Sequence, residues 1–275
     1  MNRRTVDRAA LNAAALAAIA VFAFPVYWMV STAFKPTMQI QSDPPVLVPT
    51  DGTVQHFITA VTKADFPVFL RNSLIVTLSA VALAVAVALL AAVAVGRMQW
   101  RGRKAYVLMV IAVQMAPFEA LLIPFFIVFR QYDLLNRLPA LILVYFVTTM
   151  PFTIWMLRGF VASVPVELEE AAMVDGCSRF KAFLRVVLPL LGPGLVATSI
   201  YGFITAWNEF LYAFVFMERE NQTLPVWLSS FRTAFGTDWG AIMAGSTLFT
   251  LPVLVFFLLV HRRMVAGLTA GAVKG

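Results

Sequence analysis

Long apolar stretches separated by short charged clusters are the main pattern of this chain. A bilayer core of roughly 30 Å is crossed by about 20 apolar residues in a helix, and four uncharged stretches meet that length. Two further stretches are as long but contain one acid each, Glu119 and Glu209. The pattern therefore predicts an all-α membrane protein with six crossings. The expected spans are about residues 9–34, 72–96, 105–129, 138–157, 190–217 and 239–260.

The composition agrees with a bilayer environment. Of the 275 residues, 61% are apolar and only 13% are charged, with a mean hydropathy of +0.84. A soluble domain would carry roughly 25% charged residues. The net charge of +7 does not indicate nucleic-acid binding, because the basic residues cluster at the ends of apolar runs, where they anchor helices at membrane surfaces. We expect residues 1–275 to form a single transmembrane domain.

The distribution of lysine and arginine predicts the orientation. With a cytoplasmic N-terminus, fourteen basic residues fall inside and seven outside, and cytoplasmic loops carry the excess in membrane proteins. Six crossings then put both termini in the cytoplasm. The first span has about 25 uncharged residues and ends near Tyr27-Trp28, which favours a retained helix over a cleaved signal peptide.

The residues needed for catalysis or metal binding are scarce. One cysteine, Cys177, excludes an internal disulfide, and two histidines exclude a multi-histidine metal site. No nucleotide-binding loop of the G-x-x-x-x-G-K-[ST] type and no hydrolase motif occurs. We expect a non-enzymatic chain that holds no metal or cofactor of its own.

The loop at 164–189, between the fourth and fifth spans, predicts two short helices. Pro165 suits a first helical turn, and Glu170 lies in an acidic stretch that favours the positive end of the helix dipole. Ala171-Ala172 offers a flat surface to a partner. Asp175-Gly176 permits a turn with positive φ into a second helix that begins near Ser178. An amphipathic surface helix without a partner remains an alternative.

The loop resembles a known element. Glu170-Ala171-Ala172, Asp175-Gly176, Leu188-Pro189 and Pro193 are similar to the EAA loop of ABC importer permeases. In that family the loop lies in a cleft of the ATPase subunit. The resemblance implies ATPase-coupling roles for Glu170, Ala171, Ala172, Asp175 and Gly176.

Further motifs narrow the resemblance to the second permease subunit of carbohydrate importers of the maltose and glycerol-3-phosphate type. They are Trp207-Asn208-Glu209-Phe210, Thr223-Leu224-Pro225-Val226, Asp238-Trp239-Gly240 and the tail from Gly267 to Gly275. The resemblance implies the type I importer permease fold and a multi-pass subunit of a prokaryotic cytoplasmic membrane. It also implies a different second permease, two ATPase subunits that bind ATP and Mg²⁺, and an extracytoplasmic sugar-binding protein.

Polar groups within the spans are candidates for the translocation path, because an ionisable side chain in hydrocarbon is costly unless it faces protein or water. Glu119, Asn208, Glu209 and Tyr145 are the tentative set. A structural hydrogen bond to a neighbouring helix is the alternative role for each acid.

Two other functions remain open from the residues alone. An ion-coupled secondary transporter normally contains an intramembrane charge pair or proton relay, and no basic residue lies within a predicted span. A membrane scaffold would recruit a cytoplasmic partner through the 164–189 loop without transporting anything. Only an importer requires ATPase subunits and a different permease.

Overall fold

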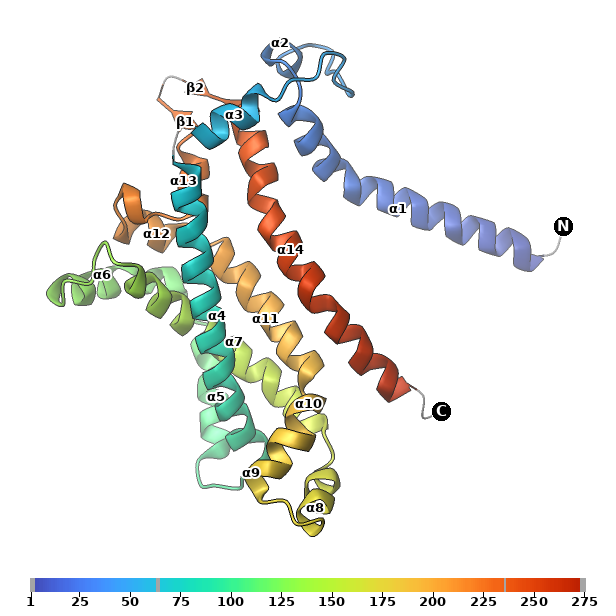
Figure 1. The fold of residues 1–275 in the computed structure, drawn as a ribbon, viewed down its shortest axis with the longest axis vertical. Helices are drawn as coiled ribbons and strands as arrows, with labels where there is room; N and C mark the ends of the chain where they lie inside the picture. Colours follow the sequence, from blue (N-terminus) through green and yellow to red (C-terminus); the bar gives the residue numbers. More distant parts are fainter. Residues whose placement is uncertain (1–2, 63–64, 235, 273–275) are drawn as a thin grey trace. The chain divides into compact units, whose positions relative to one another are not determined.

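The computed structural model describes residues 3–62, 65–234 and 236–272, and side chains within 11–260 of these ranges. Lys63 and the last three residues of the expected tail motif, 273–275, lie outside the described residues. Helices dominate, as Figure 1 shows, and the only strands in the described ranges form a two-residue hairpin, β1 (Arg232–Thr233) with β2 (Gly236–Thr237). The predicted all-α class is therefore confirmed.

Four described helical segments are long and apolar enough to cross a membrane. They are Leu11–Ala33 of α1 (Arg3–Ala33), α4 (Phe66–Arg97), α7 (Leu138–Ser163) and Trp239–Val260 of α14 (Trp239–Ala272). Two bent helix pairs meet the same test when each pair is taken as one span, which gives up to six crossings.

The third and fifth expected spans differ from straight helices. In the third, α5 (Arg103–Gln114) and the segment from Phe118 to Gln131 meet at 87°, beside Pro117. The second segment comprises η1 (Phe118–Leu121) and α6 (Leu122–Gln131). Proline has no N–H to continue the helical ladder, so a break is expected there.

The fifth expected span, 190–217, is not one helix. Gly192-Pro193 opens α11 (Gly192–Trp207), which is bent by 66° from the preceding segment and ends at Trp207. A separate helix, α12 (Leu211–Phe216), follows. Apolar composition alone does not reveal such a break, because long apolar runs lie on both sides of Asn208-Glu209.

The chain divides into two compact units. The first comprises residues up to 67 and 227–251, and the second comprises 68–226 together with the rest of α14. The first unit contains α1, the β-hairpin and the first part of α14. It also contains α2 (Thr37–Ile40), α3 (Gln55–Thr62) and the end of α13 (Leu224–Ser229).

The second unit contains the broken helices and the loop of interest. At one end of this unit lie α8 (Val166–Val174) and α9 (Arg179–Ala182), drawn in yellow in Figure 1. A π-helical turn (Phe183–Val187) and α10 (Leu188–Leu190) connect α9 to α11. A short 3₁₀ turn, η3 (Arg219–Asn221), follows α12.

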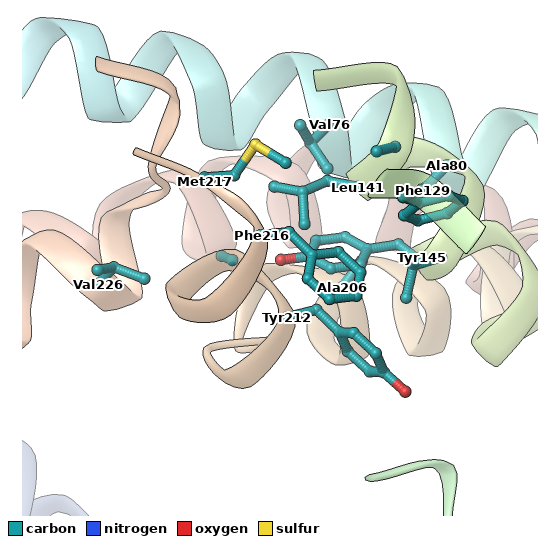
Figure 2. Packing of buried hydrophobic residues seen from close by; sticks show 13 residues of the cluster. Val76, Ala80, Phe129, Leu141, Tyr145, Ala206, Tyr212, Phe216, Met217 and Val226 are labelled. Atoms are coloured by element: carbon teal, nitrogen blue, oxygen red, sulfur yellow. The ribbon is translucent and has the colours of Figure 1, made fainter. Parts of the chain in front are cut away.

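Helix α7 packs against both α5 and α11, and two apolar clusters lie along it. One cluster joins α4, α7 and α12 through Val76, Leu141, Tyr145 and Phe216, which converge in Figure 2. The other includes Ala88, Leu157 and Val187, nearer to α8 and α9. Close helix approach accompanies the second cluster, since a Cβ on Gly96 would lie 2.7 Å from Cγ1 of Val161. These contacts hold α4 and α7 together just before the 164–189 loop.

Candidate coupling loop and translocation path

The turn between α8 and α9 has the predicted conformation. Gly176 has φ +88°, and its N–H donates to the carbonyl of Met173 at 3.1 Å. The N–H of Cys177 donates to the carbonyl of Ala172 at 3.0 Å. These two bonds form a Schellman motif, which satisfies the last carbonyls of α8 and requires a left-handed residue at the position of Gly176.

The second helix begins where expected. Ser178 caps α9, with its hydroxyl oxygen accepting from the N–H of Lys181 at 3.4 Å. At the other end of α8, Pro165 is the N-cap residue and not the first helical residue. The loop is therefore a defined helix–turn–helix element with ordered ends.

Much of the surface of this element is open to solvent. Glu170, Ala171, Asp175 and Gly176 are exposed, and Ala172 is half-buried. Large apolar side chains accompany them, and the exposed ones are Val166, Leu168, Met173, Val174 and Phe180. Val174 reaches 87% exposure. The element therefore exposes several large apolar side chains together with the acidic Glu170 and Asp175.

A buried ion pair joins α8 to the end of α4. Glu169 is 6% exposed, and its Oε2 accepts from Nη1 of Arg97, the last residue of α4, at 3.0 Å. Nη2 of Arg97 donates to the carbonyl of Val164, just after α7, at 2.9 Å. Oε1 of Glu169 lies 3.5 Å from Nε of Arg179, whose side chain is largely exposed. Arg97 thus connects the end of α4 to both the end of α7 and the middle of α8.

The burial of this pair makes it costly to break. The Arg97 and Glu169 side chains are only 6% and 8% exposed. Removing one partner of a buried pair costs about 3–5 kcal/mol, because the other charge is left uncompensated. Displacement of α8 alone would break the pair, so α8 and α4 are expected to move together. A cavity of about 420 Å³ adjoins the pair, and Leu90, Met98, Phe180 and Phe183 are among its lining residues.

Two helix breaks of the second unit lie side by side: the break before η1 and the break between α11 and α12. The hydroxyl of Tyr212, in α12, donates to the carbonyl of Phe118, in η1, at 2.5 Å. In Figure 2 the Tyr212 ring projects away from the neighbouring buried side chains. Broken helices at membrane depth are tolerated where they are buried in protein or line a water-filled cavity.

The expected pathway residues have different surroundings. Glu119 is exposed beside the first break, and Asn208 is exposed after α11, with its side-chain amide donating to the carbonyl of Ile204 at 2.7 Å. Tyr145 is only 1% exposed, and its hydroxyl donates to the carbonyl of Glu209 at 3.4 Å. Trp207 is buried to the same degree and stacks on Phe203. Of the four expected pathway residues, Glu119 and Asn208 are the two with exposed side chains.

The carboxylate of Glu209 forms a helix cap. Its Oε1 accepts from the N–H of Tyr212 at 2.9 Å, and its Oε2 accepts from the N–H of Ala213 at 3.3 Å. These are two of the backbone donors left unpaired at the start of α12. Glu209 thus has the structural hydrogen bonds that were the alternative to a pathway role.

Sequence reasoning missed Arg97 and Val164, and it assigned the acidic stretch that contains Glu169 only to the helix dipole. The ion pair joins residues 72 positions apart, so no local spacing indicates it. Among the residues with described side chains, no group of three or more histidine, cysteine, aspartate or glutamate residues could hold a metal ion.

Comparison with known proteins gives consistent matches. The family model "Binding-protein-dependent transport system inner membrane component" matches residues 84–269. The diacetylchitobiose uptake system permease protein of Streptomyces coelicolor is 50% identical over 276 residues, which cover 100% of both chains. A trehalose/maltose transport system permease protein of Thermococcus litoralis is 32% identical and also covers 100% of both chains.

A solved structure shares the fold. One chain of a bacterial ABC transporter involved in the import of the acidic polysaccharide alginate matches with a TM-score of 0.77 and 19% identity. The match covers 95% of this chain and 98% of that chain, which confirms the expected importer permease fold. Because the family model spans most of the chain and full-length relatives exceed 30% identity, the chain belongs to the family of binding-protein-dependent transport system inner membrane components.

Proposed function

We propose that the chain is one of two permease subunits in an ATP-driven, binding-protein-dependent sugar importer. The family membership supports a transport component of the membrane, and the full-length relatives are named for sugar uptake. In this role the chain supplies half of the translocation path. It carries out no catalysis, and two partner ATPase subunits bind ATP and Mg²⁺ and hydrolyse the nucleotide.

The arrangement of exposed and buried residues in α8 is the observation that supports this proposal most. Its outer face exposes Glu170, Ala171 and an apolar surface, while its inner Glu169 is held by Arg97 at the end of α4. A docked element that is also fastened to a spanning helix can transmit the movement of a partner. We therefore assign ATPase coupling to Glu170, Ala171, Ala172, Asp175 and Gly176, with Arg97 as a positioning residue.

The transport mechanism then has two alternating states. Closure of the two ATPase subunits displaces α8, and the Arg97–Glu169 pair carries this displacement to α4 and α7. The cavity between the two different permeases reorients as a result. An external binding protein delivers the sugar to the outward-facing state. This arrangement puts the 164–189 loop and both termini in the cytoplasm.

The substrate is proposed from the relatives and the exposed polar groups. The relative with 50% identity is named for diacetylchitobiose uptake, so an N-acetylated disaccharide is the first cargo to test. Glu119 and Asn208 lie exposed at the two helix breaks and offer oxygens and an amide to sugar hydroxyls. Tyr145 and Glu209 contribute by holding α11 and α12 in place.

Site-directed cross-linking tests the proposed docking directly. Ala171→Cys, in a Cys177→Ser background, is expected to cross-link to a cysteine in the cleft of the ATPase subunit, with a yield that changes on addition of ATP. Gln55→Cys, at an exposed position of α3, is the matched control and should give no such product. A failure of Ala171→Cys to cross-link at any cleft position would overturn the assignment.

A further inference from the structure

The first unit contains a cavity with mixed polar and apolar lining that the transport mechanism does not use. Its volume is about 370 Å³, and it lies between the end of α1, the segment that follows it and the start of α14. Its polar lining includes Thr32, Lys35 and Gln39, and its aromatic lining is Trp28 and Trp239. All of these residues belong to the first unit.

The cavity contains a buried cation without a counter-charge. Lys35 is 1% exposed, and its Nζ lies 3.8 Å from the centroid of the Trp28 ring. No carboxylate among the residues with described side chains lies within salt-bridge distance of this Nζ. The Trp28 ring stabilises the ammonium by about 1–2 kcal/mol, which offsets only part of the several kcal/mol that burial of an ion costs. Burial accordingly lowers the pKa of Lys35 from its usual value.

Two more polar atoms of the cavity are unpartnered. Oγ1 of Thr32 and Oε1 of Gln39 are buried without a hydrogen-bond partner in the described part of the chain. The amide of Gln39 is fixed, because its Nε2 donates to Oγ1 of Thr50 at 2.7 Å. The cavity thus offers three groups to a ligand. They are the Lys35 ammonium, which can donate to an oxyanion, the Thr32 hydroxyl, and the Gln39 carbonyl oxygen, which can accept from a ligand hydroxyl.

The position of the cavity indicates which oxyanion it meets. Trp28 lies near the end of the span Leu11–Ala33, and Trp239 is the first residue of the span that ends at Val260. Tryptophan at span ends marks the level of the lipid headgroups. Nearer the bilayer core, α1 exposes apolar side chains that suit acyl chains, including Phe24 at 52% and Val21 at 69%.

We propose that this cavity binds the phosphate of an anionic phospholipid whose headgroup carries hydroxyls, of the phosphatidylglycerol class. The lipid phosphate pairs with the Lys35 ammonium. A headgroup hydroxyl donates to Gln39, and the Thr32 hydroxyl donates to a phosphate oxygen. The bound lipid stabilises the 36–45 segment against α1 and α14. This inference does not depend on the cargo or on the coupling loop.

Native mass spectrometry and thermal unfolding of the purified full complex test the proposal. With phosphatidylglycerol, we expect retained lipid and a higher Tm for the wild type and for Lys35→Arg, which keeps the charge. Lys35→Gln should bind this lipid at least tenfold more weakly. Lys104→Gln, which changes an exposed lysine of α5, is the matched control and should behave as wild type. Phosphatidylcholine should give a smaller Tm rise than phosphatidylglycerol in the wild type, Lys35→Arg and Lys104→Gln, and this difference should disappear in Lys35→Gln.

Two further measurements test whether the anion is a lipid phosphate or a free phosphate ester, and whether Thr32 contributes to binding. Glycerol 3-phosphate at millimolar concentration should not reproduce the Tm rise, and equal stabilisation by it would replace the lipid with a free phosphate ester. Thr32→Val should reduce phosphatidylglycerol binding without loss of folding. Unchanged lipid binding by both Lys35→Gln and Thr32→Val would overturn the proposal. Loss of stimulation by the binding protein in Lys35→Gln, with lipid binding intact, would instead assign the cavity to a partner's carboxylate.

Discussion

Nη1 of Arg97 donates to Oε2 of Glu169 at 3.0 Å, and this contact joins the end of α4 to the middle of α8. The same guanidinium reaches the Val164 carbonyl after α7. Two spanning helices and the exposed loop element are therefore held at one point. A buried pair with this connectivity is suited to transmitting a displacement. If α8 moved without α4, the pair would separate and leave uncompensated charge.

Arg97→Ala and Glu169→Ala should each reduce transport strongly, since each leaves the other charge buried and unpaired. The expected cost is about 3–5 kcal/mol of local stability. Arg179→Ala is the matched control, because its side chain is 69% exposed and the contact is 3.5 Å. Its effect should stay below about 1 kcal/mol. Uptake per assembled complex is the measurement, and equal uptake by Arg97→Ala and Arg179→Ala would contradict the transmitting role.

Gly176→Val should uncouple ATP hydrolysis from transport while insertion into the membrane stays normal. A Cβ at this position would meet nothing within 4 Å, so the penalty comes only from φ +88°. The left-handed region costs about 1–2 kcal/mol for an ordinary residue, and more for a branched one. Gly176→Asn, which tolerates this region, is the control. Stimulation of ATPase activity by loaded binding protein measures the effect, and an unchanged value for Gly176→Val refutes it.

The orientation should appear in single-cysteine labelling on a Cys177→Ser background. Gln55→Cys is expected to react with a membrane-impermeant reagent from outside the cell, and Ala171→Cys only after the cytoplasmic side is opened. Both positions have exposed side chains, so accessibility does not bias the comparison. Labelling of position 55 from the cytoplasmic side alone would reverse the topology that the distribution of basic residues predicts.

Glu119 and Glu209 should respond differently to substitution. Glu209→Ala removes the acceptor of two backbone N–H groups at α12. It should lower the stability of the assembled complex by about 1–2 kcal/mol. Glu119→Gln should leave assembly normal and change the apparent affinity or rate of sugar uptake. Uptake normalised to assembled complex separates the two effects. Normal uptake by both Glu119→Gln and Glu119→Leu would remove Glu119 from the path.

Local chemistry made part of this structure predictable. Gly176 follows an acidic, alanine-rich stretch, and the φ requirement of a helix C-terminus is a property of neighbouring residues alone. The apolar spans could be predicted for the same reason, since the length of an apolar run is a local property of the sequence. The end of α11 at Trp207 was not, because Phe210 and the residues after it continue the apolar run.

The long-range contacts lay beyond sequence reasoning. Glu169 reads as one of several acids in a first helical turn, and only the folded arrangement distinguishes it from the exposed Glu170. Glu209 caps α12 through contacts only three and four residues along the chain, but this role depends on the break after Trp207, which sequence reasoning did not predict. Tyr145 was in the tentative pathway set, and the folded chain buries its ring in the apolar cluster of Figure 2.

Sugar uptake by proteoliposomes that contain the complete complex tests the central claim most directly. The vesicles would hold ATP inside and meet loaded binding protein outside, with an ionophore present to collapse ion gradients. The account predicts uptake that requires internal ATP and both permeases, persists with the ionophore, and falls at least tenfold in Arg97→Ala. Uptake without ATP that is driven by an ion gradient, or uptake by this chain alone, would contradict it.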